Sequence, residues 1–199
     1  MVTNNMISSV IEQITKNNNV EIERIRTDYF KHVQNTNNLI LPEKVQTSFS
    51  GSANLRTDTK YDFYDTKGNL LQYTLQEKTP ISFIWGYNGQ YPVAKIENAS
   101  FSEVKTALNL NDQQIQALSP IANPANSDFT KLKNLQSQLP QTLVTIYTYK
   151  PLIGIISETD ANGITIYYEY DDYGRLKLIR DNNKNIIKSY QYHYQNETP

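Results

Sequence analysis

The 199-residue sequence contains no cysteine and only two histidines, His32 and His193. The lack of cysteine excludes disulfides, thiolate nucleophiles and cysteine-based zinc sites. It does not identify the compartment, because surface proteins can also lack cysteine. Neither histidine has a partner at metal-ligand spacing, and His193 lies on the polar side of a tyrosine-rich segment. We therefore predict no metal site and a solvated surface position for His193.

Long apolar runs and a surplus of basic residues are also missing. No run approaches the roughly 20 apolar residues of a transmembrane helix. Residues 1–20 lack the basic start and continuous apolar stretch of a signal peptide. Lys and Arg number 19 against 20 Asp and Glu, so no basic excess is available for a phosphate backbone. We expect no membrane insertion and no nucleic-acid partner, while this chain alone leaves its localisation open.

What the sequence does contain is tyrosine, with 15 copies, together with turn-like asparagine clusters. Tyrosine suits a pleated, half-buried surface, and asparagine tolerates the left-handed backbone of tight turns. Hydrophobic residues make up 38% of the chain and charged residues 20%, which permits a buried core. This composition predicts many short strands joined by turns.

The chain alternates between strand-like and helix-like patterns. A helix is predicted for Met6–Thr15, followed by a strand at Val20–Phe30 and another at Leu39–Phe49 that Pro42 interrupts. Strands return from residue 60 and again from Leu143, with turn signals such as Asn88-Gly89 between them. The turns in the last part recur every 9 to 11 residues, at Pro151–Gly154, Asn162-Gly163, Tyr173-Gly174 and Asn183-Lys184.

Residues 100–140 instead show helical spacing. Ser100 with Glu103 forms a capping-box pattern, Asn111 with Gln114 repeats it, and Asp128–Leu139 carries apolar residues on one helical face. We predict a helical insert of three short segments that covers one side of a sheet. The expected fold class is mainly β with a helical insert, a β-rich α+β arrangement, and its parts are residues 1–59, 60–99, 100–140 and 141–199 of one continuous domain.

A shift of the sequence on itself by 106 residues aligns residues 61–70 with residues 167–176. The identical pairs are Tyr61/Tyr167, Tyr64/Tyr170, Asp65/Asp171, Gly68/Gly174 and Leu70/Leu176. Each type has a role in a hairpin. The tyrosine ends a strand and packs its ring on the next strand, the aspartate accepts backbone hydrogen bonds two or three residues on, and the glycine supplies a positive φ. The leucine starts the returning strand.

These residues carry a resemblance to a known family. Tyr170 to Leu176 resembles the YD repeat of RHS and YD-repeat proteins, and Trp85 to Asn88 with Tyr91-Pro92 resembles the version found in large surface proteins of Bacteroidetes. The resemblance implies antiparallel hairpin repeats in a curved sheet that encloses a cargo or presents a cell-surface face, in a secreted or surface-exposed bacterial protein. The implied partners are the remainder of a longer chain or another protein.

Three departures limit what the resemblance implies. Two clear repeats are too few for a closed shell, and the helical insert separates them. The dipeptide Asp-Pro, which belongs to the self-cleavage motif of many RHS toxins, does not occur. We therefore carry over neither autoproteolysis nor a toxin tip, and expect a terminal piece of a longer assembly or a small stand-alone derivative.

Candidate chemistry is sparse. Asp171 and Asp172 are adjacent carboxylates, but neighbouring residues of a strand face opposite sides, and the turn already occupies Asp171. The segment Asp181–Asn185 begins like a calcium loop, yet Ile186 stands where glycine is needed and Tyr192 where the bidentate glutamate is needed. Phosphate-binding loops and the Gly-x-Ser-x-Gly elbow do not occur. The sequence predicts no enzyme and no cofactor.

The leading hypothesis is therefore a structural or interaction module whose repeat positions are Tyr64, Asp65, Gly68, Tyr170, Asp171 and Gly174. The alternative is a carbohydrate-binding module, because aromatic faces can stack on sugars. The residues of that surface would be Trp85, Tyr87, Tyr91, Tyr190, Tyr192 and Tyr194, although packing in a core is the favoured explanation of the first three. A hydrolase ranks third, because the sequence does not offer a nucleophile, a base and an orienting group that could act together.

Overall fold

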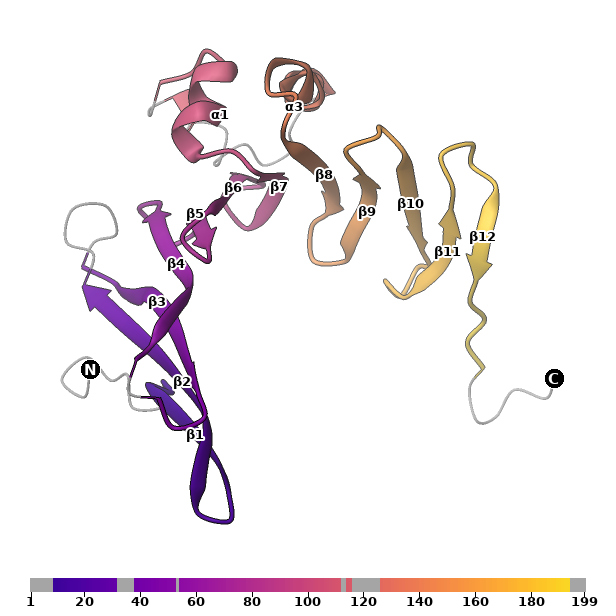
Figure 1. The fold of residues 1–199 in the computed structure, drawn as a ribbon. Coiled ribbons are helices and arrows are strands. Elements are labelled where there is room, and N and C mark those ends of the chain that lie inside the picture. Colours follow the sequence, from indigo (N-terminus) through magenta and orange to yellow (C-terminus); the bar gives the residue numbers. More distant parts are fainter. Residues whose placement is uncertain (1–8, 32–37, 53, 112–113, 116–125, 194–199) are drawn as a thin grey trace. The chain divides into compact units, whose positions relative to one another are not determined.

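The computed structural model describes residues 9–31, 38–52, 54–111, 114–115 and 126–193 (Figure 1). Its strands hydrogen-bond to one another in the order of the sequence, and their pairings are antiparallel. The elements are β1 (Glu12–Asn17), β2 (Val20–Lys31), β3 (Ile40–Phe49), β4 (Arg56–Tyr64), β5 (Leu70–Leu75), β6 (Thr79–Gly86), β7 (Tyr91–Glu97), α1 (Phe101–Ala107), α3 (Asn126–Gln138), β8 (Leu143–Lys150), β9 (Gly154–Thr159), β10 (Thr165–Tyr170), β11 (Leu176–Arg180) and β12 (Ile186–Ser189). The prediction of a mainly β fold with antiparallel hairpins and a helical insert is confirmed.

The chain divides into two compact units. The first unit contains residues 1–83 and 97–112, and the second contains residues 84–96 and 113–199. The division passes through β6 and β7, so each unit combines segments from both sides of the expected boundary at residues 99 and 100.

In the first unit, the predicted helix at Met6–Thr15 is wrong over its described part. Residues 12–17 form β1, which pairs with β2 through a turn in which Asn18 and Asn19 have φ of 48° and 62°. The asparagine run thus forms the turn of a hairpin and does not end a helix. Pairing with β2 provides hydrogen-bond partners for the backbone groups of this segment. The spacing of apolar residues within the segment does not reveal that partner.

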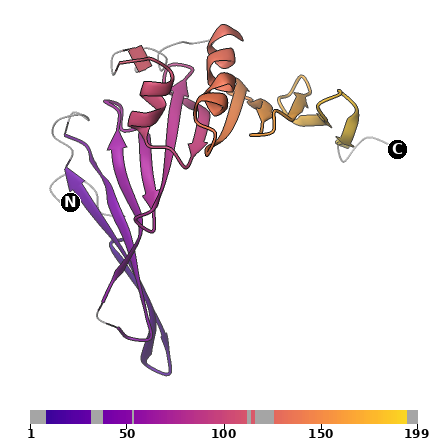
Figure 2. The same ribbon diagram turned by 45° about the horizontal axis from the view of Figure 1, so that its top comes forward.

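The next hairpins of this unit follow the prediction more closely. The predicted strand at Val20–Phe30 is confirmed as β2, and Figure 2 shows β2 to β5 lying side by side. Pro42 does not interrupt β3. It lies opposite Tyr29, where the register between β2 and β3 shifts, and such an irregularity tolerates a residue without an N–H group.

Helix α1 begins as predicted, with a capping box. The Ser100 hydroxyl accepts a hydrogen bond from the Glu103 N–H, and the Glu103 carboxylate accepts one from the Ser100 N–H. Phe101 and Val104 are buried, and the Phe101 N–H donates to Oε1 of Gln72 on β5 at 2.7 Å. The helix is therefore fixed to the sheet of the first unit by both an apolar face and a polar anchor.

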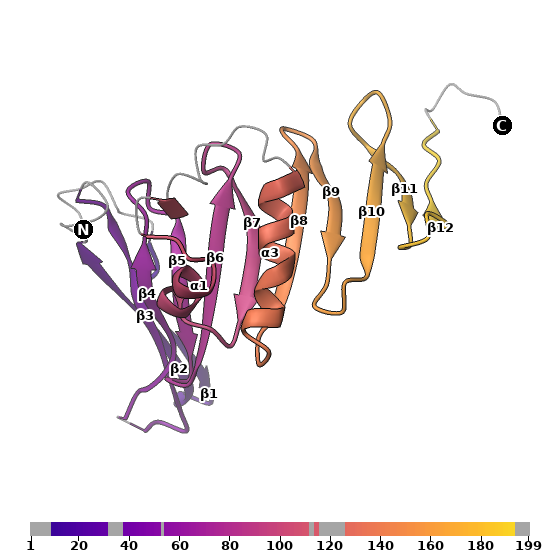
Figure 3. The same cartoon turned by 90° about the horizontal axis from the view of Figure 1, so that it is seen from above.

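In the second unit, α3 lies alongside β8 (Figure 3). Phe129, Leu132 and Leu135 of the helix are buried. The side chains of Val144 and Ile146 on β8 are buried as well. This confirms the predicted helix at Asp128–Leu139, which the structure places at Asn126–Gln138. Most of the middle predicted segment lies outside the described residues, and only residues 114–115 of it are seen as helical.

Candidate functional site

The repeated feature of the fold is a turn built around an aspartate. Asp65, Asp160, Asp171 and Asp181 each use Oδ1 to accept the N–H groups of the residues two and four positions later, at 2.8–2.9 Å. The N–H three residues on donates to the aspartate's own carbonyl instead, at 2.9–3.1 Å. The sequence predicts that the aspartate accepts hydrogen bonds from the N–H groups two or three residues later, and the structure shows that these donors lie two and four residues later.

Three of these turns add a hydrogen bond to the second carboxylate oxygen. The side chain at the fourth position donates to Oδ2, from Asn69 at 3.0 Å, from Arg175 at 2.7 Å and from Asn185 at 3.0 Å. In the turn of Asp160 the fourth position is Ile164, which has no such donor. The carboxylates therefore act as fixed acceptors for a backbone turn.

The position three residues after the aspartate has a positive φ in every copy. Glycine provides it at Gly68, Gly163 and Gly174, with φ of 88°, 77° and 75°. Lys184 adopts φ of 68° in the fourth copy. The predicted role of glycine is confirmed, and the segment resembling a calcium loop proves to be a fourth turn that lacks this glycine.

The hydrogen bonds of the turn also favour the ionised carboxylate. Desolvation opposes ionisation of Asp171, but hydrogen bonds from Arg175 and Tyr173 outweigh it and hold the pKa of Asp171 below its ordinary 3.8. The Asn185 side-chain amide, aided by the N–H groups of Asn185 and Asn183, likewise lowers the pKa of Asp181 against desolvation. Such a carboxylate is a poor proton donor or base near neutral pH.

Tyrosines at strand ends lock one strand to the one before it. The hydroxyl of Tyr64 donates to the Pro42 carbonyl at 2.7 Å, and that of Tyr170 donates to the Ile155 carbonyl at 2.8 Å. Burial raises the pKa of Tyr64 well above its ordinary value, so the phenol stays protonated as a donor. Tyr192 makes the same contact with the Leu176 carbonyl at 2.8 Å.

Two of the aromatic residues expected near Asn88-Gly89 belong to a packed group. The Tyr87 ring stands edge-on to the rings of Tyr91 and Tyr149, and Tyr91 stacks on Tyr149 with centroids 4.7 Å apart. The Tyr87 hydroxyl accepts the Tyr149 N–H, and the Tyr149 hydroxyl donates to the Pro92 carbonyl. Tyr87 is only 6% exposed, which leaves no ring face for a sugar. Trp85 is half-buried.

The expected aromatic stripe on a terminal strand is wrong in its described part. β12 ends at Ser189, before Tyr190 and Tyr192, and Tyr194 lies outside the described residues. The Tyr192 ring instead packs against the Arg175 guanidinium, 4.3 Å from its centroid. His193 is exposed, as predicted, whereas His32 lies outside the described residues.

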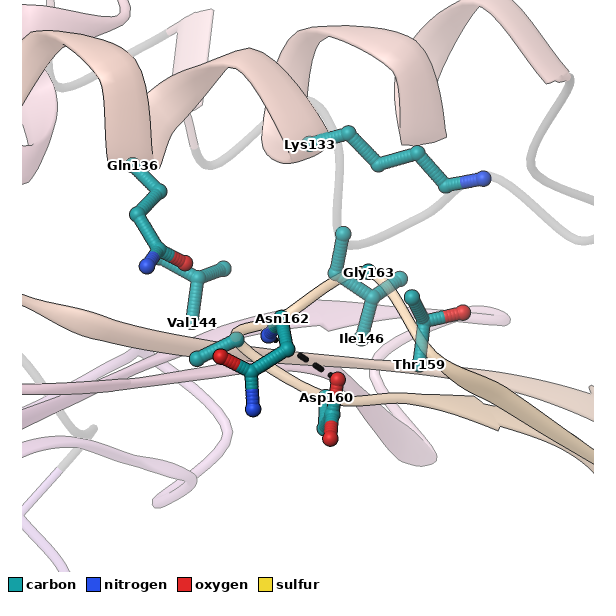
Figure 4. Close-up of a pocket in the computed structure, with 9 residues that line it drawn as sticks. Lys133, Gln136, Val144, Ile146, Thr159, Asp160, Asn162 and Gly163 are labelled. Carbon is teal, nitrogen blue, oxygen red and sulfur yellow. Dashed lines mark hydrogen bonds between the residues drawn. The ribbon is translucent and has the colours of Figure 1, made fainter.

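A hollow that the sequence did not reveal opens beside α3, within the second unit (Figure 4). It has a volume of about 320 Å³ and adjoins another of about 360 Å³, with which it shares Lys133, Ile146 and Thr159. Gln136 reaches from the helix toward the strands, and Lys133 extends sideways along the helix, whereas the strands and the turn of Asp160 supply the opposite wall (Figure 4). The one sequence signal for this hollow is that threonine and serine recur at alternate positions of successive strands.

Metal ligands and membrane spans can be checked over the described part of the chain. Within those ranges, His, Asp and Glu side chains form no group of three that could hold a metal ion. No helix there is both long and apolar enough to cross a membrane.

No family model and no curated protein matches the chain. Solved structures that it resembles include the crystal structure of TcdB2-TccC3 without its hypervariable C-terminal region, at 12% identity and a TM-score of 0.48, over 91% of this chain. Another is the Photorhabdus luminescens Tc holotoxin pore, at 12% identity and a TM-score of 0.46, over 87% of this chain. The chain spans 8% of the length of either match. At TM-scores below 0.5, these likenesses decide neither its fold nor its function.

Proposed function

We propose that this chain is a non-catalytic structural segment of a hairpin-repeat protein of the YD/RHS type. One observation carries the proposal: four aspartate turns, at Asp65, Asp160, Asp171 and Asp181, repeat the same set of hydrogen bonds. Repetition of one fixed turn builds a sheet strand by strand. The carboxylates of these four aspartates are engaged by backbone N–H groups.

The role assigned to the segment is to extend a sheet shared with further repeats, either of a longer chain or of another protein. β12 has the features of an open edge. All four of its residues are exposed, and Ile186 and Ile187 are 57% and 59% exposed. An edge strand with unpaired backbone groups and apolar side chains is a template for another strand. Export to a cell surface follows from the resemblance and belongs to the same proposal.

β1, at the opposite end of the strand order, differs in the described residues. It carries two charged residues, Glu12 and Lys16, and Glu12 forms an ion pair with Arg24 at 3.2 Å, whereas β12 carries Lys188 alone. Charges on an edge strand discourage strand addition. We therefore assign the docking role to β12.

The test is self-association of the purified chain, followed by light scattering over a range of concentrations. We expect oligomers whose fraction rises with concentration, and we expect Ile187→Lys to reduce them because a charge on an edge strand blocks pairing. Leu152→Lys is the matched control, since Leu152 is 94% exposed at the tip between β8 and β9. A monomer at every concentration, or equal effects of both substitutions, would refute the docking role of β12.

A further inference from the structure

Hydroxyl groups gather on one face of three neighbouring strands of the second unit. Ser157 of β9 lies opposite Thr148 of β8, and Thr159 of β9 lies opposite Thr165 of β10. The hydroxyls of Thr159 and Thr165 are hydrogen-bonded at 2.9 Å, and those of Thr148 and Ser157 are hydrogen-bonded to each other. All four side chains line the adjoining hollow of about 360 Å³.

The part of β8 that lies against α3 carries apolar side chains instead of hydroxyl groups on the corresponding face. On β8, α3 covers Val144 and Ile146, which are 3% and 4% exposed. On β9 and β10 the neighbours of Ile146 are Thr159 and then Thr165, which are each 8% exposed. A floor of hydroxyls beside an apolar helix interface is what a polar ligand needs, because buried polar groups cost stability unless they are hydrogen-bonded.

The paired hydroxyls keep capacity for a ligand. A hydroxyl offers one donor hydrogen and two acceptor lone pairs. In a pair such as Thr159 and Thr165 only one hydrogen is used between the two, so the second hydrogen and several lone pairs remain for a third group. Two such pairs next to each other match a ligand that itself carries several hydroxyl groups.

Charged and aromatic side chains lie near the hydroxyl groups of the two hollows. Lys133 lines both hollows, and within the described residues its ammonium has no carboxylate partner. Lys184 lies over the ring of Tyr167, which borders the hydroxyl floor. The one carboxylate of the lining, Asp160, directs Oδ1 to the N–H groups of its own turn. Asp160 lines only the first hollow, and in the hollow of about 360 Å³ Lys133 is the one charged side chain among the described residues of the lining.

We propose that this hollow binds a small carboxylate that carries hydroxyl groups, such as a sugar acid. Lys133 holds the carboxylate, the floor of Thr148, Ser157, Thr159 and Thr165 holds the ligand hydroxyls, and Phe129 and Tyr167 border the site. Its volume lies at the lower end of the range of roughly 300–1,000 Å³ for small-molecule sites. The site is independent of β12 and of strand addition.

The experiment is a titration of the isotope-labelled full chain with glucuronate, followed by amide NMR shifts. We expect saturable shifts at residues 144–148 and 156–167, with weaker binding of glucose, which lacks the carboxylate, and of acetate, which lacks the hydroxyls. Lys133→Gln should weaken glucuronate binding about ten-fold. Lys131→Gln removes an exposed cation from the same helix outside the hollow, and should leave the affinity unchanged.

The floor is tested separately with Thr159→Val and with Thr148→Val, a less buried position that retains the fold if the first substitution destabilises it. Each removes one hydroxyl at nearly constant shape, and we expect each to weaken glucuronate binding while acetate binding stays the same. Absence of saturable shifts at concentrations on the order of 10 mM would overturn the proposal. So would shifts confined to other residues, or equal affinities for glucose and glucuronate that Lys133→Gln does not alter.

Discussion

At the residue scale, the aspartate turn shows how one side chain can replace several backbone contacts. Oδ1 of Asp171 receives the N–H groups of Tyr173 and Arg175, while its N–H and carbonyl bond to the returning strand and to Gly174. Backbone groups at a tight turn would otherwise depend on water. A single residue type thus sets the geometry of the turn, and the glycine makes the required φ accessible.

Two turn glycines with different surroundings, Gly163 of the aspartate turn and Gly154 at the start of β9, give the first prediction. A Cβ at Gly163 would meet nothing within 4 Å, whereas one at Gly154 would lie 2.7 Å from the Tyr170 hydroxyl. Gly163→Ala should cost about 1 kcal/mol, from the positive φ of 77° alone. Gly154→Ala should cost at least about 2 kcal/mol, because it also displaces the hydroxyl from the Ile155 carbonyl.

Urea unfolding of both variants, followed by circular dichroism, measures the difference. Adding Tyr170→Phe to Gly154→Ala removes the hydroxyl that collides, so the double variant should recover part of the loss. Equal losses for Gly154→Ala and Gly163→Ala would contradict the contact with Tyr170.

Two buried serines give the second prediction. Ser82 is fully buried and donates to the Ala99 carbonyl at 2.9 Å, whereas the hydroxyl of Ser48, which is 3% exposed, has no hydrogen-bond partner in the described structure. Ser82→Ala should cost about 1–2 kcal/mol because it leaves a buried carbonyl unpaired. Ser48→Ala should be neutral or stabilise by up to about 1 kcal/mol, since it removes an unpaired hydroxyl. Thermal unfolding distinguishes the two, and a comparable destabilisation by Ser48→Ala would show that its hydroxyl is paired.

The lowered pKa of Asp171 gives the third prediction, on pH dependence. A carboxyl group whose pKa is lower in the folded state stabilises the fold above its unfolded pKa of about 3.8. That stabilisation is lost as the pH falls from there through the folded pKa. Asp171→Asn should therefore lower the urea midpoint at pH 7, and the gap to the unmodified protein should close at pH 2 to 3. Asp172→Asn is the control, because Asp172 makes no hydrogen bond into the described turn, and an equal effect would contradict the assignment.

At the scale of elements, hairpins and capped helices were predictable, while the choice between strand and helix at the N-terminal side was not. The turn of Asp171 and the capping box of Ser100 both depend on residues less than five positions apart in the sequence. The segment at Glu12–Asn17 has the apolar spacing of a helix, yet pairing with β2 decides its state. Pairing partners at a distance are absent from any local pattern, and the same holds for the hydroxyl floor around Thr159, which three strands assemble.

The capping box of α1 gives the fourth prediction. Ser100→Ala removes the acceptor for the Glu103 N–H and one donor to its carboxylate, and should cost about 1 kcal/mol. Hydrogen bonds from the Ser100 side chain and backbone lower the pKa of Glu103, so the substitution should also raise that pKa toward its ordinary value. Carbon-detected NMR titration of the Glu103 carboxyl measures it. Ser102→Ala, on the exposed side of the helix, should change neither stability nor pKa.

At the scale of the whole molecule, the strand order equals the sequence order from β1 to β12, so each strand pairs with the strands that precede and follow it in the sequence. Repeat proteins with this connectivity have stabilities that sum local terms and neighbour terms. A chain of this kind differs from a domain in which distant segments close a single core. Loss of a terminal strand should then be felt by its neighbours and not by remote strands.

The fifth prediction follows from this connectivity. Truncation after Arg180 removes β12 and the turn of Asp181. It should lower amide hydrogen-exchange protection in β11, which loses its partner strand and the hydrogen bond from Tyr192, and at Thr165 of β10, whose N–H loses its acceptor on Asn182. Protection of β3 to β5 in the first unit should stay unchanged, because their hydrogen bonds are made with one another, with β2 and β6, and with α1. A loss of protection throughout the chain would mean that it unfolds as one cooperative body, and a scaffold built by adding hairpins would then be the wrong description.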